Sequence, residues 1–161
     1  MPRKKKRLFA VFFDYKNISD GFEQNGGELG DIYPLLKSIL EQGEIIFAFV
    51  FVPDHFISKS PVRQLSYKYR FHVVACPRQI YGVVAKDKDS VDAMMDSLAR
   101  RYIEHSNITD VAIFSGDGDF TELATYAFWR KKKVTVVGVR NSTNGRFMEM
   151  AKEEIIDLVQ H

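Results

Sequence analysis

Residues 111–120 read VAIFSGDGDF, an apolar run followed at once by two aspartates, Asp117 and Asp119. The run 111–114 is too short for a helix and is typical of a strand buried on both faces. The glycines on either side of Asp117 favour a turn where this strand leaves the core. Two carboxylates about 4 Å apart repel each other by roughly 4 kcal/mol at an effective dielectric near 20. Two carboxylates this close therefore need a partner that offsets their repulsion.

Short apolar runs and amphipathic segments alternate along the whole chain. We predict strands, from the apolar runs, over residues 8–13, 45–52, 71–76, 111–114, 134–139 and 155–159. We predict helices, from apolar residues at helical spacing, over residues 28–42, 62–69, 89–105, 119–132 and 145–149. Such alternation indicates crossover connections, and therefore a mainly parallel sheet with helices on both faces. The expected fold class is α/β, a single-domain three-layer sandwich with a mainly parallel central sheet.

Length and composition exclude several classes of protein. The chain has 161 residues and 45% hydrophobic residues, which suits one globular domain. No apolar run approaches the roughly 20 residues that span a bilayer, and no secretory signal is expected. The single cysteine, Cys76, excludes a disulfide framework and disfavours a thiolate metal cage. No G-x-S-x-G motif supports a serine hydrolase. These features favour a cytoplasmic protein.

Charge is distributed in blocks, although the net charge is only +2. Residues 3–7 are all basic, and residues 130–133 form a second basic block. The aspartates concentrate in residues 87–119. Basic groups around an acidic centre would suit a polyanion that is drawn toward a metal. The alternative is a solvated tail and a helix C-terminus that favours cations. The sequence leaves both interpretations open.

Further aspartates occupy positions where ligands collect in parallel sheets. Asp14 ends the first predicted strand, and ligands of such sheets bind beyond the carboxyl ends of the strands. On the predicted helix 89–105, Asp89, Asp92 and Asp96 form a strip beside the apolar face, and Asp92 is best placed to be half-buried. Capping is the alternative for Asp89 as an N-cap, and for residues 119–122 as a capping box.

Converging carboxylates need a cation, a proton or basic partners. Hard divalent cations prefer oxygen ligands, and Mg²⁺ or Mn²⁺ keeps waters that can act as nucleophiles. The spacing of Gly116 and Gly118 is not that of a direct phosphate cradle, because the third glycine is absent and Asp119 would repel a pyrophosphate. The sequence therefore favours an oxygen-ligated metal site.

Three motifs together resemble the NYN domain, a branch of the PIN-like nucleases that includes the LabA-like bacterial proteins. They are D-x-x-N at residues 14–17, K-D-S-V-D at residues 88–92, and S-G-D-G-D-F at residues 115–120. The similarity extends from Leu8 to Leu158. It implies a PIN-like, Rossmann-like fold, with residues 1–7 as a basic N-terminal tail and residues 8–161 as the NYN domain.

The resemblance implies a metal-dependent endoribonuclease, a hydrolase that cleaves RNA phosphodiester bonds with a water activated by aspartate-held Mg²⁺ or Mn²⁺. RNA, single-stranded or structured, would be the partner, with no membrane involved. The implied catalytic and metal-binding set is Asp14, Asp92, Asp117 and Asp119, with Asp96 or Asp89 as substitutes for Asp92. Asn17 and Ser115 would support the site, Lys16, Lys86 and Lys88 would hold phosphates, and Tyr15 and Tyr81 could stack on bases.

Two other functions stay open at this point. The first is an RNA-binding or adaptor module whose metal pocket is degenerate or only structural. The second is a phosphatase or receiver-like domain, which ranks last because a D-x-D-x-T/V motif is absent at Asp14. One domain offers little room for a long RNA groove. A homodimer is therefore an alternative to a monomer.

Overall fold

A six-stranded sheet lies at the centre of the protein, which we describe from a computed structural model covering residues 5–79, 88–105 and 107–161. The strand order is β3-β2-β1-β6-β7-β8, and every neighbouring pair is parallel. This confirms the expected α/β fold with a parallel central sheet. The strands are β1 (Arg7–Asp14), β2 (Gly43–Pro53), β3 (His72–Cys76), β6 (Asp110–Phe114), β7 (Lys133–Gly138) and β8 (Asp157–Gln160).

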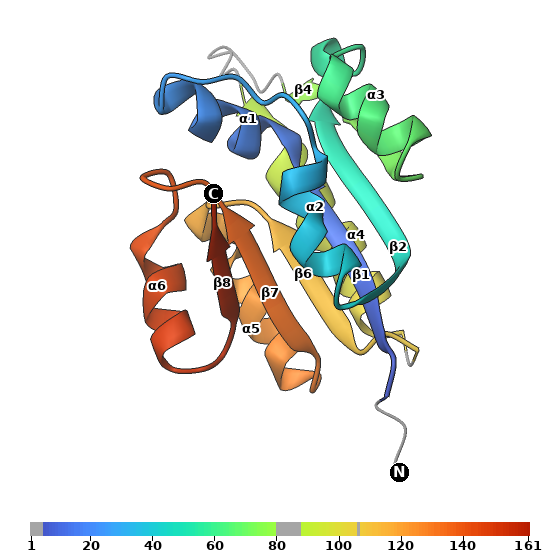
Figure 1. The fold of residues 1–161 in the computed structure, drawn as a ribbon, viewed down its shortest axis with the longest axis vertical. Coiled ribbons are helices and arrows are strands. Elements are labelled where there is room, and N and C mark those ends of the chain that lie inside the picture. The colour runs from blue at the N-terminus through green and yellow to red at the C-terminus, as the bar shows by residue number, and fades with distance from the viewer. Residues whose placement is uncertain (1–4, 80–87, 106) are drawn as a thin grey trace.

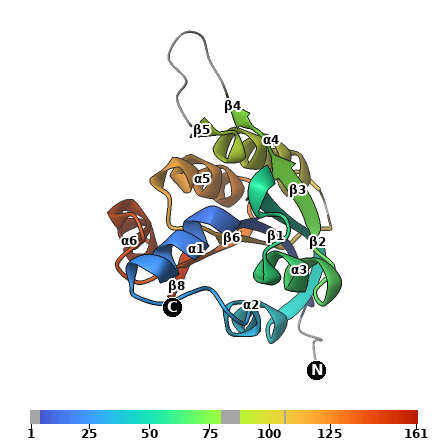
Figure 2. The same cartoon turned by 90° about the horizontal axis from the view of Figure 1, so that it is seen from above.

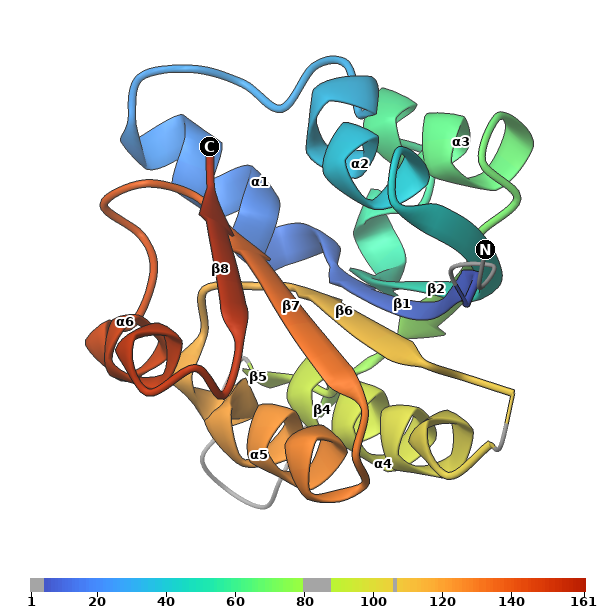
Figure 3. The ribbon, with the colours of Figure 1, turned by 60° about the horizontal axis from the view of Figure 1, so that its bottom comes forward.

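Helices cover both faces of this sheet and complete a three-layer sandwich (Figures 1 and 3). One face carries α1 (Tyr15–Gln24), α2 (Tyr33–Leu40) and α3 (Ser60–Tyr67). The other face carries α4 (Val91–Ile103), α5 (Thr121–Trp129) and α6 (Gly145–Lys152). In Figure 2, seen from above, α4 and α5 lie on the side of the strands opposite to α2. None of the helices in the described part of the chain has the length and apolarity of a membrane span.

The side chains of β1 alternate between two hydrophobic cores. Phe9, Val11 and Phe13 pack in the core under α1, α2 and α3. Ala10 and Phe12 pack in the core under α4 and α5. Successive strand residues point to opposite faces, so Asp14 belongs to the α4 side of the sheet.

The chain runs outward from β1 to β3 and then returns to β6 on the other side of β1. The strand order therefore reverses between β1 and β6. In open parallel sheets, a crevice forms beyond the carboxyl ends of the strands at such a reversal, because the connections diverge there. Asp14 ends β1 and Ser115 follows β6, so both lie at this crevice.

Helix α1 has no counterpart among the helices that we predict from spacing. It buries Tyr15, Ile18 and Gly21. A Cβ at Gly21 would lie 2.8 Å from the Cβ of Val139, so glycine lets the helix approach the end of β7. Glycine weakens the local helix signal, and tertiary packing outweighs that propensity here. The helix expected over 28–42 is also shorter, since α2 begins only at Tyr33, with Pro34 in its first turn.

Two expected helix starts are wrong. Asp89 does not cap a helix, because it lies in the short strand β5 (Lys88–Asp89), which pairs with β4 (Arg78–Gln79). Helix α4 begins at Val91, and the hydroxyl of its N-cap, Ser90, donates to the Pro77 carbonyl instead of capping the helix. The capping box over 119–122 is absent as well, since residues 118–120 form a 3-10 turn and α5 follows without a side-chain cap.

The basic blocks do not surround the acidic residues. Arg7 is the first residue of β1 and Lys133 is the first residue of β7, so residues 5–7 and 130–133 lie at the amino edge of the sheet, near the end marked N in Figure 1. Asp14 lies at the opposite edge. Because β1 has eight residues, the two edges are about 23 Å apart. The structure therefore favours the alternative, in which residues 130–133 follow the C-terminus of α5.

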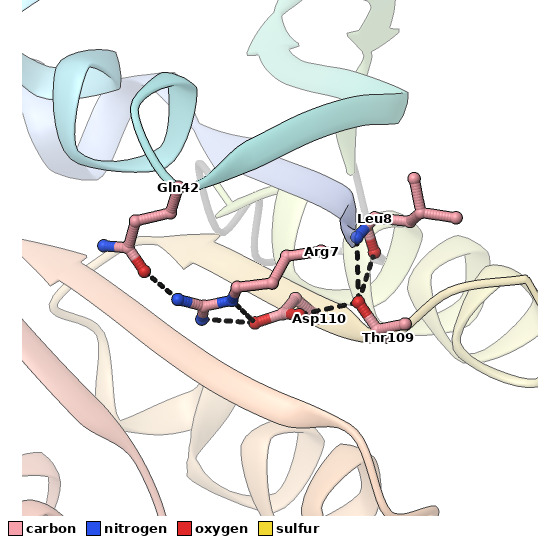
Figure 4. A network of polar contacts seen from close by, with 5 residues as sticks. All are labelled: Arg7, Leu8, Gln42, Thr109 and Asp110. Carbon is pink, nitrogen blue, oxygen red and sulfur yellow. Dashed lines mark hydrogen bonds and ion pairs between the residues drawn. The ribbon is translucent and has the colours of Figure 1, made fainter. Parts of the chain in front are cut away.

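An ion pair between the half-buried Arg7 and the buried Asp110 ties the start of β1 to β6 (Figure 4). The carboxylate of Asp110 is 1% exposed and accepts hydrogen bonds from Arg7 Nε at 3.0 Å and from Thr109 Oγ1 at 2.7 Å. Arg7 also donates to Gln42, just before β2. The pair thus holds together the first residues of neighbouring strands.

Replacing Arg7 by Met should lower the free energy of unfolding by about 2 kcal/mol, because the buried Asp110 carboxylate loses a charged donor and keeps Thr109. Urea unfolding at pH 7 measures this change. Lys6→Met is the control, since Lys6 pairs with Glu44 on the surface at 2.7 Å and such pairs contribute less than about 1 kcal/mol. Equal losses in the two variants would contradict the assignment.

Candidate metal centre

Asp14 is the best-buried acid of the candidate site, with 3% of its surface exposed. It ends β1 and is also the N-cap of α1, where its Oδ1 accepts from the backbone N–H of Asn17 at 3.3 Å. Its Oδ2 accepts from the hydroxyl of Ser115 at 3.1 Å. The hydrogen bond expected of Ser115 within the site is therefore present.

The loop that follows β6 brings the second acid. Ser115 is fully buried, and its Oγ also accepts from the backbone N–H of Asp117 at 3.1 Å. The backbone N–H of Gly116 donates to Asn17 Oδ1 at 2.8 Å. Asn17 thus joins the loop to α1, contacting Asp14 through its backbone and Gly116 through its side chain. These bonds fix the loop against the end of β1.

Helix α4 supplies the third acid. Asp92 lies in its first turn and is half-buried, as its place beside the apolar face predicts. Carboxylate oxygens of Asp14, Asp92 and Asp117 all lie within 4.8 Å of one another. In the described part of the chain, this is the group of acidic, His or Cys side chains whose geometry could hold a metal ion. We call these three residues the acidic triad.

Burial raises the pKa of Asp14 from its ordinary value of 3.8 to about 7. Removal from water is the largest cause, and the charges of Asp92 and Asp117 add to it. The hydrogen bonds from Asn17 and Ser115 act in the opposite direction, because they stabilise the ionised form. The triad without a cation therefore holds a proton near neutral pH, and a bound divalent cation would replace that proton.

The glycines of SGDGDF are required by close packing against the loop after β7. A Cβ at Gly118 would lie 2.4 Å from Asn144 Nδ2, and one at Gly116 would lie 2.5 Å from the Ser142 carbonyl oxygen. Asn144 also donates its backbone N–H to Gly116 O at 2.8 Å and caps α6. Sequence spacing does not reveal this contact, since the two loops are separated by α5 and β7.

Comparison with protein-family models identifies the family of this chain. The NYN domain model matches residues 8–158, nearly the whole chain. The chain belongs to the NYN domain family. NYN domains are part of the PIN-like nuclease superfamily, so the resemblance of the three motifs is confirmed and the fold is nuclease-like.

One solved structure supports the fold, and a second is reported beside it. A protein of unknown function from Vibrio parahaemolyticus matches with a TM-score of 0.77 and 23% identity, covering 99% of this chain and 96% of that one. MurG from Acinetobacter baumannii matches with a TM-score of 0.48 and 14% identity, and the alignment covers 96% of this chain and 45% of MurG. No curated protein matches the sequence.

Two aspartates of the expected set lie outside the acidic triad of this NYN domain. Asp119 is exposed in the 3-10 turn, where its backbone N–H donates to Asp117 Oδ1 at 2.9 Å. Asp96 lies one turn beyond Asp92 on α4 and forms an ion pair with Arg100 at 3.0 Å. Asp89 lies in β5, and its side chain is outside the described part of the structure. The geometry thus selects Asp92 over Asp96 on α4.

The residues expected to contact RNA are placed only in part. Lys16 is half-buried on the first turn of α1, close to the triad in sequence and at the same edge of the sheet. Tyr15 is 4% exposed and packs against Phe56. Little of its ring is therefore accessible for stacking on a base. Lys86 and Tyr81 lie outside the described residues, as does the side chain of Lys88.

Proposed function

We propose that this NYN domain is a metal-dependent endoribonuclease that hydrolyses RNA phosphodiester bonds. The observation that carries the proposal is the acidic triad, in which three carboxylates from β1, α4 and the loop after β6 converge at the reversal of strand order. Membership of the NYN family supports nuclease activity and RNA as its substrate.

The donor set fits a hard divalent cation. Three carboxylate oxygens within 4.8 Å of one another offer the ligands that Mg²⁺ and Mn²⁺ prefer. Asp14, Asp92 and Asp117 would hold the ion. When bound, it would supply Lewis-acid stabilisation of the phosphate and lower the pKa of water. A soft metal is disfavoured, because among the described residues no sulfur or imidazole ligand joins the group.

The chain's own residues orient this centre. Ser115 donates to Asp14 and accepts from the Asp117 backbone, so a single hydroxyl sets the distance between two of the acids. Asn17 holds Gly116, which keeps the loop from moving away from β1. Lys16 is the described lysine closest in sequence to the triad, and we assign it to a phosphate of the RNA beside the site.

Finer features belong to the same proposal. They are Mg²⁺ or Mn²⁺ as the ion, a cytoplasmic location, residues 8–161 as the domain after a basic tail, and a homodimer as the alternative to a monomer. Residues 1–4 lie outside the described part, and Arg7 already belongs to β1. Mass measurement in solution decides the oligomeric state.

The purified protein should cleave an end-labelled single-stranded RNA in the presence of Mn²⁺ or Mg²⁺ and not in EDTA. DNA of the same sequence and a paired RNA serve as comparison substrates. Products are resolved on a denaturing gel, where internal cuts distinguish an endonuclease from an exonuclease.

Absence of cleavage across several RNAs with both metals would reject the nuclease. RNA binding without cleavage would instead support the adaptor module, in which the triad holds an ion only structurally. Turnover of a small phosphoester without RNA cleavage would support the phosphatase class.

A further inference from the structure

A pocket of about 440 Å³ lies between α1 and α3, at the same edge of the sheet as the acidic triad. Its walls include Tyr15 and Ser19 from α1, Phe56 and Lys59 from the segment after β2, and Ser60 at the start of α3. Its volume is in the range of pockets that enclose a small organic group. Neither the family match nor the triad assigns it a role.

The pocket and the candidate metal centre involve consecutive residues of the chain. Tyr15 lines it, and the preceding residue, Asp14, belongs to the triad. Tyr15 packs in the core on the α1 side of the sheet, whereas Asp14 belongs to the α4 side, so an RNA strand that crosses the carboxyl end of β1 would pass from one site to the other. Lys16 lines the pocket on the same turn of α1.

Aromatic side chains form one part of the pocket. The rings of Tyr15 and Phe56 meet edge to face with centroids 6.4 Å apart, and Phe56 is half-buried. Lys59 Nζ lies 5.8 Å from the centroid of Phe56, at an exposed position. An aromatic face beside a cation is the combination that binds bases of single-stranded nucleic acids.

Acidic side chains form another part. Asp20, Glu23 and Glu28 line the pocket beside the two lysines, so its formal charge is negative. A phosphate inside would be repelled, whereas a neutral base would not. Carboxylates accept hydrogen bonds, and the exocyclic amino groups of cytosine, adenine and guanine donate them. Uracil has no such amino group.

We infer that this pocket receives the base of a nucleotide next to the bond that is cleaved, and that it prefers a base with an exocyclic amino group over uracil. The inference rests on the proposed function, since it takes RNA as the substrate. Lys16 and Lys59 then contact the flanking phosphates, while the base lies against Phe56.

The test measures RNA binding by fluorescence anisotropy in EDTA, in an Asp117→Asn background in which no RNA is consumed. The probes are labelled octacytidylate and octauridylate. Cytosine carries an exocyclic amino group at the position where uracil carries a carbonyl oxygen. Ser60→Trp fills the pocket from its rim. Ser58→Trp is the matched control, because Ser58 is also exposed and lies outside this pocket.

Octacytidylate should bind more tightly than octauridylate, and Ser60→Trp should weaken its binding about tenfold while Ser58→Trp leaves it unchanged. Phe56→Ala, which removes the stacking face without adding bulk, should give a similar loss. Thermal melts of all variants confirm folding. Unchanged binding in both pocket variants, or no binding of either RNA, would overturn the inference, and equal affinity for the two RNAs would overturn the base preference.

These outcomes are separate from those of the cleavage assay. Binding in EDTA reports on the pocket, and metal-dependent cleavage by the wild-type protein reports on the triad. Loss of the pocket effect with cleavage intact rejects the inference alone. An intact pocket effect without any cleavage rejects the nuclease and supports an RNA-binding module.

Discussion

Asp117→Asn should reduce metal-dependent RNA cleavage by about a thousandfold. Removing one of three carboxylates weakens ion binding and the stabilisation of the transition state, and a loss of about 4 kcal/mol corresponds to that factor. Asparagine keeps the size of the side chain and an oxygen that can accept from the Asp119 backbone, as Asp117 Oδ1 does at 2.9 Å. The fold should therefore survive. Initial rates with end-labelled RNA at saturating Mn²⁺ measure the effect.

The matched control is Asp96→Asn. Asp96 is an aspartate of α4 like Asp92, but its partner is Arg100 and it lies outside the triad. Its replacement should leave the cleavage rate close to that of the wild type, because it removes only a partly exposed ion pair. Asp119→Asn in the same series asks whether the fourth aspartate of the expected set is needed. Equal losses for Asp96 and Asp117 would contradict the triad, as would full activity without Asp117.

Without a divalent cation, the free energy of unfolding should fall by about 3 kcal/mol as the pH rises from about 4 to about 7, through the contribution of Asp14 alone. The unfolded carboxyl loses its proton near 3.8, whereas burial raises the pKa of Asp14 in the folded protein to about 7. The folded state therefore binds more protons inside this window. The contribution is fully present below the unfolded pKa, is lost as pH rises through the folded pKa, and is constant above it.

Asp14→Asn isolates this contribution, since other groups titrate in the same range. The amide carries no charge and keeps an oxygen that can accept from the Asn17 backbone. Urea unfolding in EDTA at several pH values should show the variant gaining stability over the wild type as pH rises from 4 to 8. Added Mn²⁺ should then stabilise the wild type at pH 8 and not the variant. Parallel pH profiles for the two proteins would contradict a raised Asp14 pKa.

The stability and activity effects at Asp14 have opposite signs. The substitution that stabilises the metal-free protein at pH 8 should also abolish cleavage, because it removes a candidate ligand. Such a trade-off is common where a buried charge is retained for function. A variant that is both more stable and fully active would show that Asp14 has no part in the reaction.

Local pattern was sufficient for the sheet. Runs such as residues 8–13 and 111–114 are typical of buried strands, and their alternation with amphipathic helices indicates a parallel sheet. The placement of Asp14 and Asp117 follows from the same reasoning, since parallel strands end at one edge. Asp92 is foreseeable from helical periodicity, which puts it at the border of the apolar face of α4.

Local pattern was not sufficient where distant segments meet. Helix α1 packs closely against Val139 at Gly21, more than a hundred residues away in sequence. The same glycine lowers the local helix signal, so the sequence pattern does not reveal the helix. The two-residue strands β4 and β5 are too short for any periodicity to show. The sequence left open whether the basic blocks surround the acids, and the parallel topology places them at the opposite edge of the sheet.

By itself, then, the sequence determined the strands of the parallel sheet, the helices from α2 to α6 and the edge at which acids gather, because hydrophobic period and strand-end position are local properties. Only the tertiary structure decided which acids converge. Asp14, Asp92 and Asp117 come from three separate elements, while Asp96 and Asp119 are directed to Arg100 and to the solvent. That choice depends on the angles at which α4 and the loop after β6 pack against β1, and no spacing along the chain encodes those angles directly.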